Sequence, residues 1–85
     1  MPKPRRSKLE IVADILAVLE RGCKKPTHIA TEANLAYDRM AKILEALKAR
    51  GLVVEKSAEL CITHDGLKFL EEYKKWKRLL DTLGI

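Results

Sequence analysis

The chain has no glutamine, one asparagine and two cysteines among its 85 residues. No apolar run approaches the ~18–20 residues that cross a bilayer, and no secretory signal is visible, so we do not expect a membrane or secreted protein. Scarce amides beside many Lys, Arg and Glu residues are typical of thermophile proteins. The two cysteines indicate an intracellular, reducing setting, although hyperthermophiles also use internal disulfides.

The motifs of common enzyme classes are also missing. There is no phosphate-binding glycine loop, no nucleophile elbow and no H-E-x-x-H pattern, so we expect no enzyme activity and no cofactor. Zinc-compatible side chains occur, but their C-x4-H and C-x2-H spacings are not those of a standard zinc finger. They are Cys23, His28, Cys61 and His64. We expect two separate free thiols and no metal, with a Cys23–Cys61 disulfide or a zinc site as the alternatives.

Positive charge is abundant and unevenly distributed. Seventeen basic side chains against 12 acidic ones give 17 − 12 = +5. Residues 1–8 carry four cations and no acid, and residues 35–51 carry four cations against two acids. A basic arm joined to a basic helix suits a polyanionic partner. The alternative is a surplus of charge that serves solubility alone.

A chain of this length is one small domain. We expect a flexible basic arm at residues 1–6 and a folded domain at residues 7–85. Ser7 and Glu10 have the spacing of a capping box, which predicts a first helix over about 8–21. A domain this small buries only roughly 60–65% of its unfolded surface, so self-association is plausible.

The helical pattern breaks briefly around Asn34, the only asparagine. Pro26 suits a first helical turn and predicts a short helix over about 27–33. The apolar pattern resumes over about 36–50 as another helix. Asparagine tolerates the left-handed conformation that ends a helix in a tight turn. Two helices joined in this way predict a helix-turn-helix.

The periodicity changes after this second basic segment. Residues 52–62 hold two short β-like runs around a turn without glycine, which predicts a hairpin. Thr63 suits an N-cap, and a last helix is expected over about 64–83. A very short extended piece is expected at 23–25. The resulting order predicts a mainly helical winged helix-turn-helix with a small β-hairpin.

Two segments, THIATEANLAYDRMAKILEALKARGLV and CITHDGLKFLEEYKKW, resemble the small archaeal winged-helix DNA-binding proteins, which include dimeric chromatin-associated members and transcriptional regulators. The resemblance covers about residues 7–76. It is carried by Ala33, Asn34, Leu35, Tyr37, Leu44, Leu47, Gly51, Leu52, Thr63, Gly66 and Leu70. The resemblance implies DNA binding by the helix over 36–50, backbone contacts from the hairpin, and dimerisation through the C-terminal helix.

The last predicted helix carries apolar residues at alternating spacings of four and three, which is a heptad seam. They are Phe69, Tyr73, Trp76, Leu80 and Leu83. About 19 helical residues span ~28 Å, so this helix is longer than it needs to be to cover one small core. We expect a twofold-related copy to bury the seam, with a contribution from Ile11, Ile15 or Val18. In the alternative, the helix folds back and its seam lies inside the monomer.

The expected DNA contacts come from four places along the chain. They are Arg5 and Arg6 in the arm, Lys24, Lys25 and Thr27 around the start of the second helix, Tyr37, Arg39 and Lys42 on the recognition helix, and Lys56 beside the hairpin tip. Asp38 and Glu45 oppose close phosphate contact, which indicates either few base contacts or internal ion pairs.

These features favour a homodimeric double-stranded DNA-binding protein with its third helix in the major groove. It would act as a transcriptional regulator or chromatin-associated protein, in the cytoplasm at the nucleoid. The main alternative is a winged-helix protein–protein interaction module without direct DNA binding. RNA binding is a third possibility.

Overall fold

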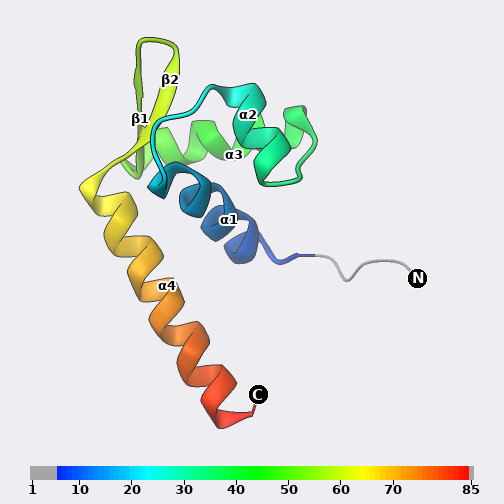
Figure 1. The fold of residues 1–85 in the computed structure, drawn as a ribbon, viewed down its shortest axis with the longest axis vertical. Coiled ribbons are helices and arrows are strands. Elements are labelled where there is room, and N and C mark those ends of the chain that lie inside the picture. Colours follow the sequence, from blue (N-terminus) through cyan, green and yellow to red (C-terminus); the bar gives the residue numbers. More distant parts are fainter. Residues whose placement is uncertain (1–5, 85) are drawn as a thin grey trace.

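The computed structural model describes residues 6–84, and Figure 1 shows their arrangement. The elements follow the order α1 (Lys8–Glu20), α2 (Pro26–Glu32), α3 (Tyr37–Ala49), β1 (Val53–Lys56), β2 (Glu59–Ile62) and α4 (His64–Leu83). The strands form one antiparallel hairpin. This confirms the predicted mainly helical winged helix-turn-helix fold. None of the helices in the described part of the chain is long and apolar enough to cross a membrane.

Helix α1 is the centre of the core. It lies between the α2–α3 pair and α4, and it also contacts β2 (Figure 1). Every helix contributes to the fully buried set, which comprises Ile11, Ile15, Leu16, Leu19, Ile29, Met40 and Leu70. Because α1 has neighbours on several sides, its apolar residues cover a broad arc instead of one narrow stripe.

The burial of α1 corrects one expectation. Ile11 is 1% exposed and belongs to the core, so it does not offer the dimer contact that was expected of it. Ile15 and Val18 are buried as well. The exposed large apolar side chain on α1 is Leu9.

The corner between α2 and α3 depends on Asn34. This residue has a φ of 56°, in the left-handed region that the sequence predicted. The amide of Leu35 donates to the carbonyl of Ala30 at 2.8 Å, and the amide of Asn34 donates to Thr31 at 3.2 Å. These two bonds form a Schellman motif, which satisfies carbonyls at the end of α2 and turns the chain toward α3.

The hairpin is tied to the segment that follows α1. Lys24 and Leu60 exchange two backbone hydrogen bonds, of 2.9 and 2.8 Å, as an antiparallel bridge. The short extended piece expected at 23–25 is therefore present as this single bridge. At the other end of the hairpin, Ser57 and Ala58 form the turn with positive φ values of 50° and 66°. Such a pair matches the right-handed twist of the strands even without glycine.

The two cysteines form a disulfide, which corrects the expectation of separate free thiols. Cys23 and Cys61 flank the Lys24–Leu60 bridge, so they are the next pair of the same antiparallel ladder. Residues opposite each other at such a non-hydrogen-bonded pair have Cα atoms ~4.5 Å apart. The observed Cα–Cα distance is 4.3 Å. The bridge register thus brings together two residues that are 38 positions apart in the sequence.

The start of α4 crosses close to the chain between α3 and β1. Thr63 caps α4 by accepting from the Gly66 amide at 3.0 Å, and its own hydroxyl donates to the Gly51 carbonyl at 2.6 Å. A Cβ added at Gly66 would overlap the Leu52 carbonyl oxygen and lie 2.7 Å from Cγ1 of Ile62. Glycine is required here for close approach, because no other residue leaves that space empty.

We expect Gly66→Ala to destabilise the fold by about 1–3 kcal/mol through overpacking against backbone. Helix propensity alone predicts the opposite sign, a gain of about 1 kcal/mol. Thermal unfolding followed by circular dichroism measures the difference. Glu72→Ala, at an exposed position of α4, is the matched control. An increase in Tm for Gly66→Ala would contradict the close contact.

The disulfide should stabilise the domain chiefly by restricting the unfolded chain. Closing a loop of this length is worth about 3–4 kcal/mol in the chain-entropy account. We expect the Cys23→Ser/Cys61→Ser double variant to melt at a lower temperature than the oxidised protein. A thiol titration under denaturing conditions, without reductant, should find no free thiol in the parent chain. Two free thiols there would contradict the bond.

Candidate nucleic-acid interface

Helix α3 presents one buried and one exposed face. Met40, Leu44 and Leu47 are buried and hold the helix against the core. The exposed face carries Tyr37, Asp38, Arg39, Lys42, Glu45, Ala46, Ala49 and Arg50. The corner at Asn34 is therefore followed by a helix that projects its polar side chains away from the domain.

The side of the exposed face nearest α1 is cationic. Arg39 and Lys42 line, with Lys8 of α1, an open groove of about 470 Å³. The rest of its lining is apolar and comprises Ile11, Val12, Ile43, Ala46 and Leu47. No ion pair involves Arg39 or Lys42 within residues 6–84. Two of the predicted DNA-binding cations thus stand together with their charges uncompensated.

The opposite side of the same face carries acids that are paired with a lysine of the same chain. Lys48 Nζ lies 2.9 Å from Glu45 Oε1 and 3.3 Å from Glu55 Oε1 on the hairpin. Hydrogen bonds to Glu45 and then Glu55 raise the pKa of Lys48 above its usual value. Of the two explanations for the acids on this helix, internal ion pairing holds for Glu45. Asp38 lies in the first turn, where the helix dipole favours an acid.

Tyr37 is the first residue of α3 and is 50% exposed. Its ring lines a small hollow with Pro26 of α2 and Ala58 of the hairpin turn. A tyrosine at this position can either contact a phosphate or close the turn against the core. The side chain is not enclosed in the core, so its position favours the outward contact.

The predicted residues around the start of α2 are not equivalent. Lys24 makes an ion pair with Glu32 at 3.5 Å and its side chain is only 29% exposed, so its charge serves the fold. Lys25 and Thr27 are exposed at the first turn of the helix. Of the three residues expected to contact DNA at the start of α2, only Lys25 and Thr27 are exposed enough to reach a phosphate.

The hairpin tip exposes Lys56, which pairs across the strands with Glu59. Its other acidic neighbour, Glu55, is occupied by Lys48. Because Lys48 is paired with Glu55, that carboxylate repels a phosphate near Lys56 less than an unpaired one would.

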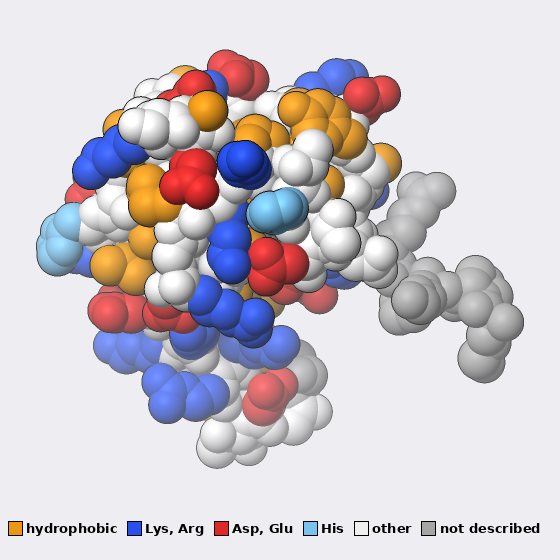
Figure 2. Space-filling view, turned by 45° about the horizontal axis from the view of Figure 1, so that its top comes forward, with side chains coloured by type: hydrophobic (Ala, Val, Ile, Leu, Met, Phe, Trp, Pro, Cys, Tyr) orange, Lys and Arg blue, Asp and Glu red, His pale blue; other side chains and the backbone are white. Residues whose placement is uncertain are grey.

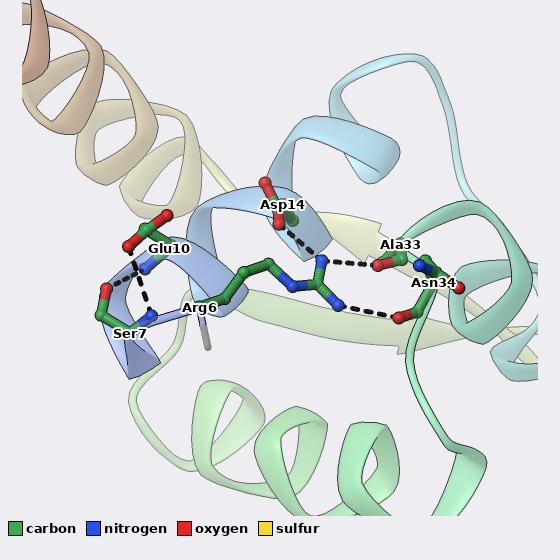
Figure 3. Close-up of polar contacts among 6 residues, drawn as sticks. All are labelled: Arg6, Ser7, Glu10, Asp14, Ala33 and Asn34. Atoms are coloured by element: carbon green, nitrogen blue, oxygen red, sulfur yellow. Dashed lines mark hydrogen bonds and ion pairs between the residues drawn. The ribbon is translucent and has the colours of Figure 1, made fainter. Parts of the chain in front are cut away.

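Arg6 lies in a different place from the one expected of a free basic arm. Its guanidinium donates to Asp14 Oδ2 and the Ala33 carbonyl, both at 2.8 Å, and to the Asn34 carbonyl at 2.7 Å (Figure 3). The last residue of the predicted arm is therefore attached to the domain. Arg5 lies outside the described residues. Because two of the three acceptors are backbone oxygens, no pattern of residue types could have predicted these partners.

The seam residues of α4 divide into two groups. Phe69 and Tyr73 are partly buried against the core of the same chain. Trp76 and Leu83 are 60% and 61% exposed, and Leu80 is 45% exposed. Leu79 is also exposed and was missed, because it does not fall on the heptad positions. The second half of α4 thus carries apolar surface that this chain does not cover.

Figure 2 shows the surface charges over the hairpin side of the molecule. Lys and Arg side chains alternate there with Asp and Glu instead of forming one uniform cationic surface. No group of three or more potential ligands among residues 6–84 could hold a metal ion. With Cys23 and Cys61 bonded to each other, the four residues considered for zinc do not form a site.

Residues 5–81 match the winged helix-turn-helix family. The fold is similar to a MarR family transcriptional regulator from Silicibacter pomeroyi, with a TM-score of 0.70, 26% identity, and coverage of 85% of this chain and 55% of that one. It is similar to the transcriptional repressor CouR, solved bound to p-coumaroyl-CoA, with a TM-score of 0.69, 26% identity, and coverage of 95% and 64%.

A transcriptional regulator from Thermotoga maritima shares the fold at 20% identity, with a TM-score of 0.66 and coverage of 88% of this chain and 61% of that one. This chain therefore spans less than two thirds of the length of each of these structures. No curated protein sequence matches it.

Proposed function

This chain belongs to the winged helix-turn-helix family, and we propose that it is a double-stranded DNA-binding protein that acts as a transcriptional regulator or chromatin-associated protein. It would bind as a homodimer with α3 in the major groove, which places it at the nucleoid of the cytoplasm. Similarity to solved transcriptional regulators over most of this chain supports the proposal.

The observation that carries the proposal is the exposed face of α3 with Arg39 and Lys42 uncompensated. A major groove admits one α-helix, whose outward side chains reach the base edges. Arg39 has the reach and the planar fork to bind guanine or a phosphate, and Lys42 suits a phosphate. Lys48 forms ion pairs with Glu45 and Glu55, so these acids repel the DNA phosphates less than two unpaired acids would.

Further contacts would position the domain without reading sequence. Lys25 and Thr27 are open at the start of α2, and Lys56 is open at the hairpin tip. Such side chains typically bind phosphate oxygens. Arg5 and the residues before it remain candidates for an additional backbone contact, and Tyr37 for a phosphate contact.

The proposed dimer rests on the second half of α4. Twenty residues span ~30 Å, and the core of the same chain covers only the first half. Trp76, Leu80 and Leu83 leave an apolar surface that a twofold-related copy would bury. Two recognition helices related in this way would favour half-sites about one turn of DNA apart.

We expect fluorescence anisotropy with a labelled DNA duplex to show binding that weakens steeply with salt, because each phosphate that the protein neutralises releases counterions. Replacing both Arg39 and Lys42 by alanine should weaken binding about tenfold or more at fixed salt, since a single bidentate contact from arginine to guanine is worth roughly 1–3 kcal/mol. The salt slope should fall by about 0.9 for each phosphate that the variant no longer neutralises.

The control is Lys75→Ala/Arg78→Ala, which removes the same charge from exposed positions of α4. It should leave affinity close to that of the parent protein. Equal decreases in affinity in both variants would mean that charge alone matters and would contradict a recognition role for α3. No binding at low salt would favour the protein-interaction alternative, and a preference for structured RNA over duplex DNA would favour RNA binding.

The dimer is tested by light scattering coupled to size exclusion. The parent chain of 9.7 kDa should elute with twice its monomer mass. Leu80→Glu/Leu83→Glu should elute as a monomer, because a buried acid in the seam is strongly unfavourable. Arg78→Glu, an acid added at an exposed non-seam position of the same helix, is the control. A monomeric parent chain at the concentrations used for DNA binding would refute the dimer.

A further inference from the structure

The hydrogen bonds of Arg6 join the N-terminal segment to the helix-turn-helix. Its side chain is 32% exposed and donates three hydrogen bonds, one to a carboxylate and two to carbonyls (Figure 3). The carboxylate is Asp14 on α1, while the carbonyls belong to Ala33 and Asn34 at the corner between α2 and α3. One guanidinium thus connects three separate parts of the chain.

The carbonyls at this corner are suited to a charged donor. The last carbonyls of a helix have no intrahelical partner, and they form the negative end of its dipole. The Schellman bonds at this corner go to the carbonyls of Ala30 and Thr31, so the carbonyls of Ala33 and Asn34 receive no backbone donor from them. A charged donor at this position satisfies both oxygens, and hydrogen bonds to charged groups are among the stronger ones.

The capping box determines where Arg6 lies. Ser7 Oγ accepts from the Glu10 amide at 3.1 Å, and Glu10 Oε1 accepts from the Ser7 amide at 3.3 Å (Figure 3). These reciprocal bonds hold the backbone of Ser7, so the preceding residue leaves α1 in one direction. Asp14 then holds the guanidinium on the side that faces the corner.

We propose that Arg6 is a positioning residue for DNA binding: it holds the α2–α3 corner against α1, and so sets the orientation of the recognition helix. This rests on the proposed function and replaces the expectation that Arg6 contacts DNA. Without Arg6, the corner would open more often and fewer molecules would be competent to bind. The apparent affinity for DNA falls in proportion to the fraction of molecules that are competent to bind.

Three variants separate positioning from direct contact, with a mixed-sequence DNA duplex as the probe. Arg6→Ala should weaken binding about fivefold or more, the decrease expected when the competent fraction falls by that factor. The salt slope should stay unchanged, because the variant neutralises as many phosphates as the parent protein. Arg6→Lys keeps the charge but lacks the planar fork, so it should not restore affinity. Arg78→Ala is the charge-matched control.

Asp14→Asn provides the opposing test, compared with Glu72→Gln, which removes one acid from an exposed position of α4. Asp14→Asn removes the carboxylate that holds the Arg6 guanidinium. If Arg6 acts through the corner, this variant should bind DNA more weakly than Glu72→Gln. Equal or tighter binding would overturn the proposal. Full recovery of affinity in Arg6→Lys, or a salt slope lower by about one per subunit in Arg6→Ala, would also overturn it.

Hydrogen exchange at the Leu35 amide, which donates to Ala30 across the corner, measures corner opening without DNA. We expect faster exchange at this amide in Arg6→Ala and Arg6→Lys, at a temperature where both variants are folded, and no change in Arg78→Ala. Unchanged exchange in the Arg6 variants would refute the proposal. If the parent protein binds no duplex, the proposed function fails, while the exchange result still decides whether Arg6 holds the corner.

Discussion

A single left-handed residue, Asn34, is the constraint on which the arrangement depends. Its conformation lets the chain leave α2 through two short hydrogen bonds and begin α3 after only a few residues. Because α3 then starts in a defined direction, Met40, Leu44 and Leu47 meet the core and the opposite face stays open. A straight continuation from α2 into α3 would place those apolar residues elsewhere and remove the projecting helix.

The small size of the domain explains why further contacts attach its segments to one another. One central helix, α1, serves as common core for its neighbours, and the hairpin contributes Val53 and Leu60 to that core. The Lys24–Leu60 bridge and the Cys23–Cys61 disulfide attach the hairpin further to the end of α1. Small domains commonly need such additions, because their cores alone supply little net stability. Gly66 completes the arrangement by letting α4 cross close to Leu52.

Local signals predicted most of the fold, while contacts between distant segments escaped them. The capping box at Ser7 and the turn at Asn34 are decided by neighbouring residues, so residue type and spacing revealed them. The disulfide depends on the register between segments 38 residues apart, which no spacing encodes. Ile11 was misplaced because the broad apolar arc of α1 does not say which side meets the core. Within the candidate site, α3 was recognised from its pattern, and internal ion pairing was one of two explanations for its acids, but Lys48 was not identified as the partner of Glu45 and Glu55.

The connection between α3 and α4 links the two halves of the proposed function. Thr63 lies directly before α4, and Gly51 and Leu52 lie just after α3. The hydroxyl of Thr63 donates to the Gly51 carbonyl at 2.6 Å, and its amide donates to the Leu52 carbonyl at 3.1 Å. Short, well-directed bonds at this joint leave little freedom for α4 to swing relative to α3. If two copies pair through the second half of α4, the separation of their recognition helices is therefore set by the seam and not by a flexible linker. A change in how α4 pairs would alter the spacing of DNA half-sites without touching any residue on α3.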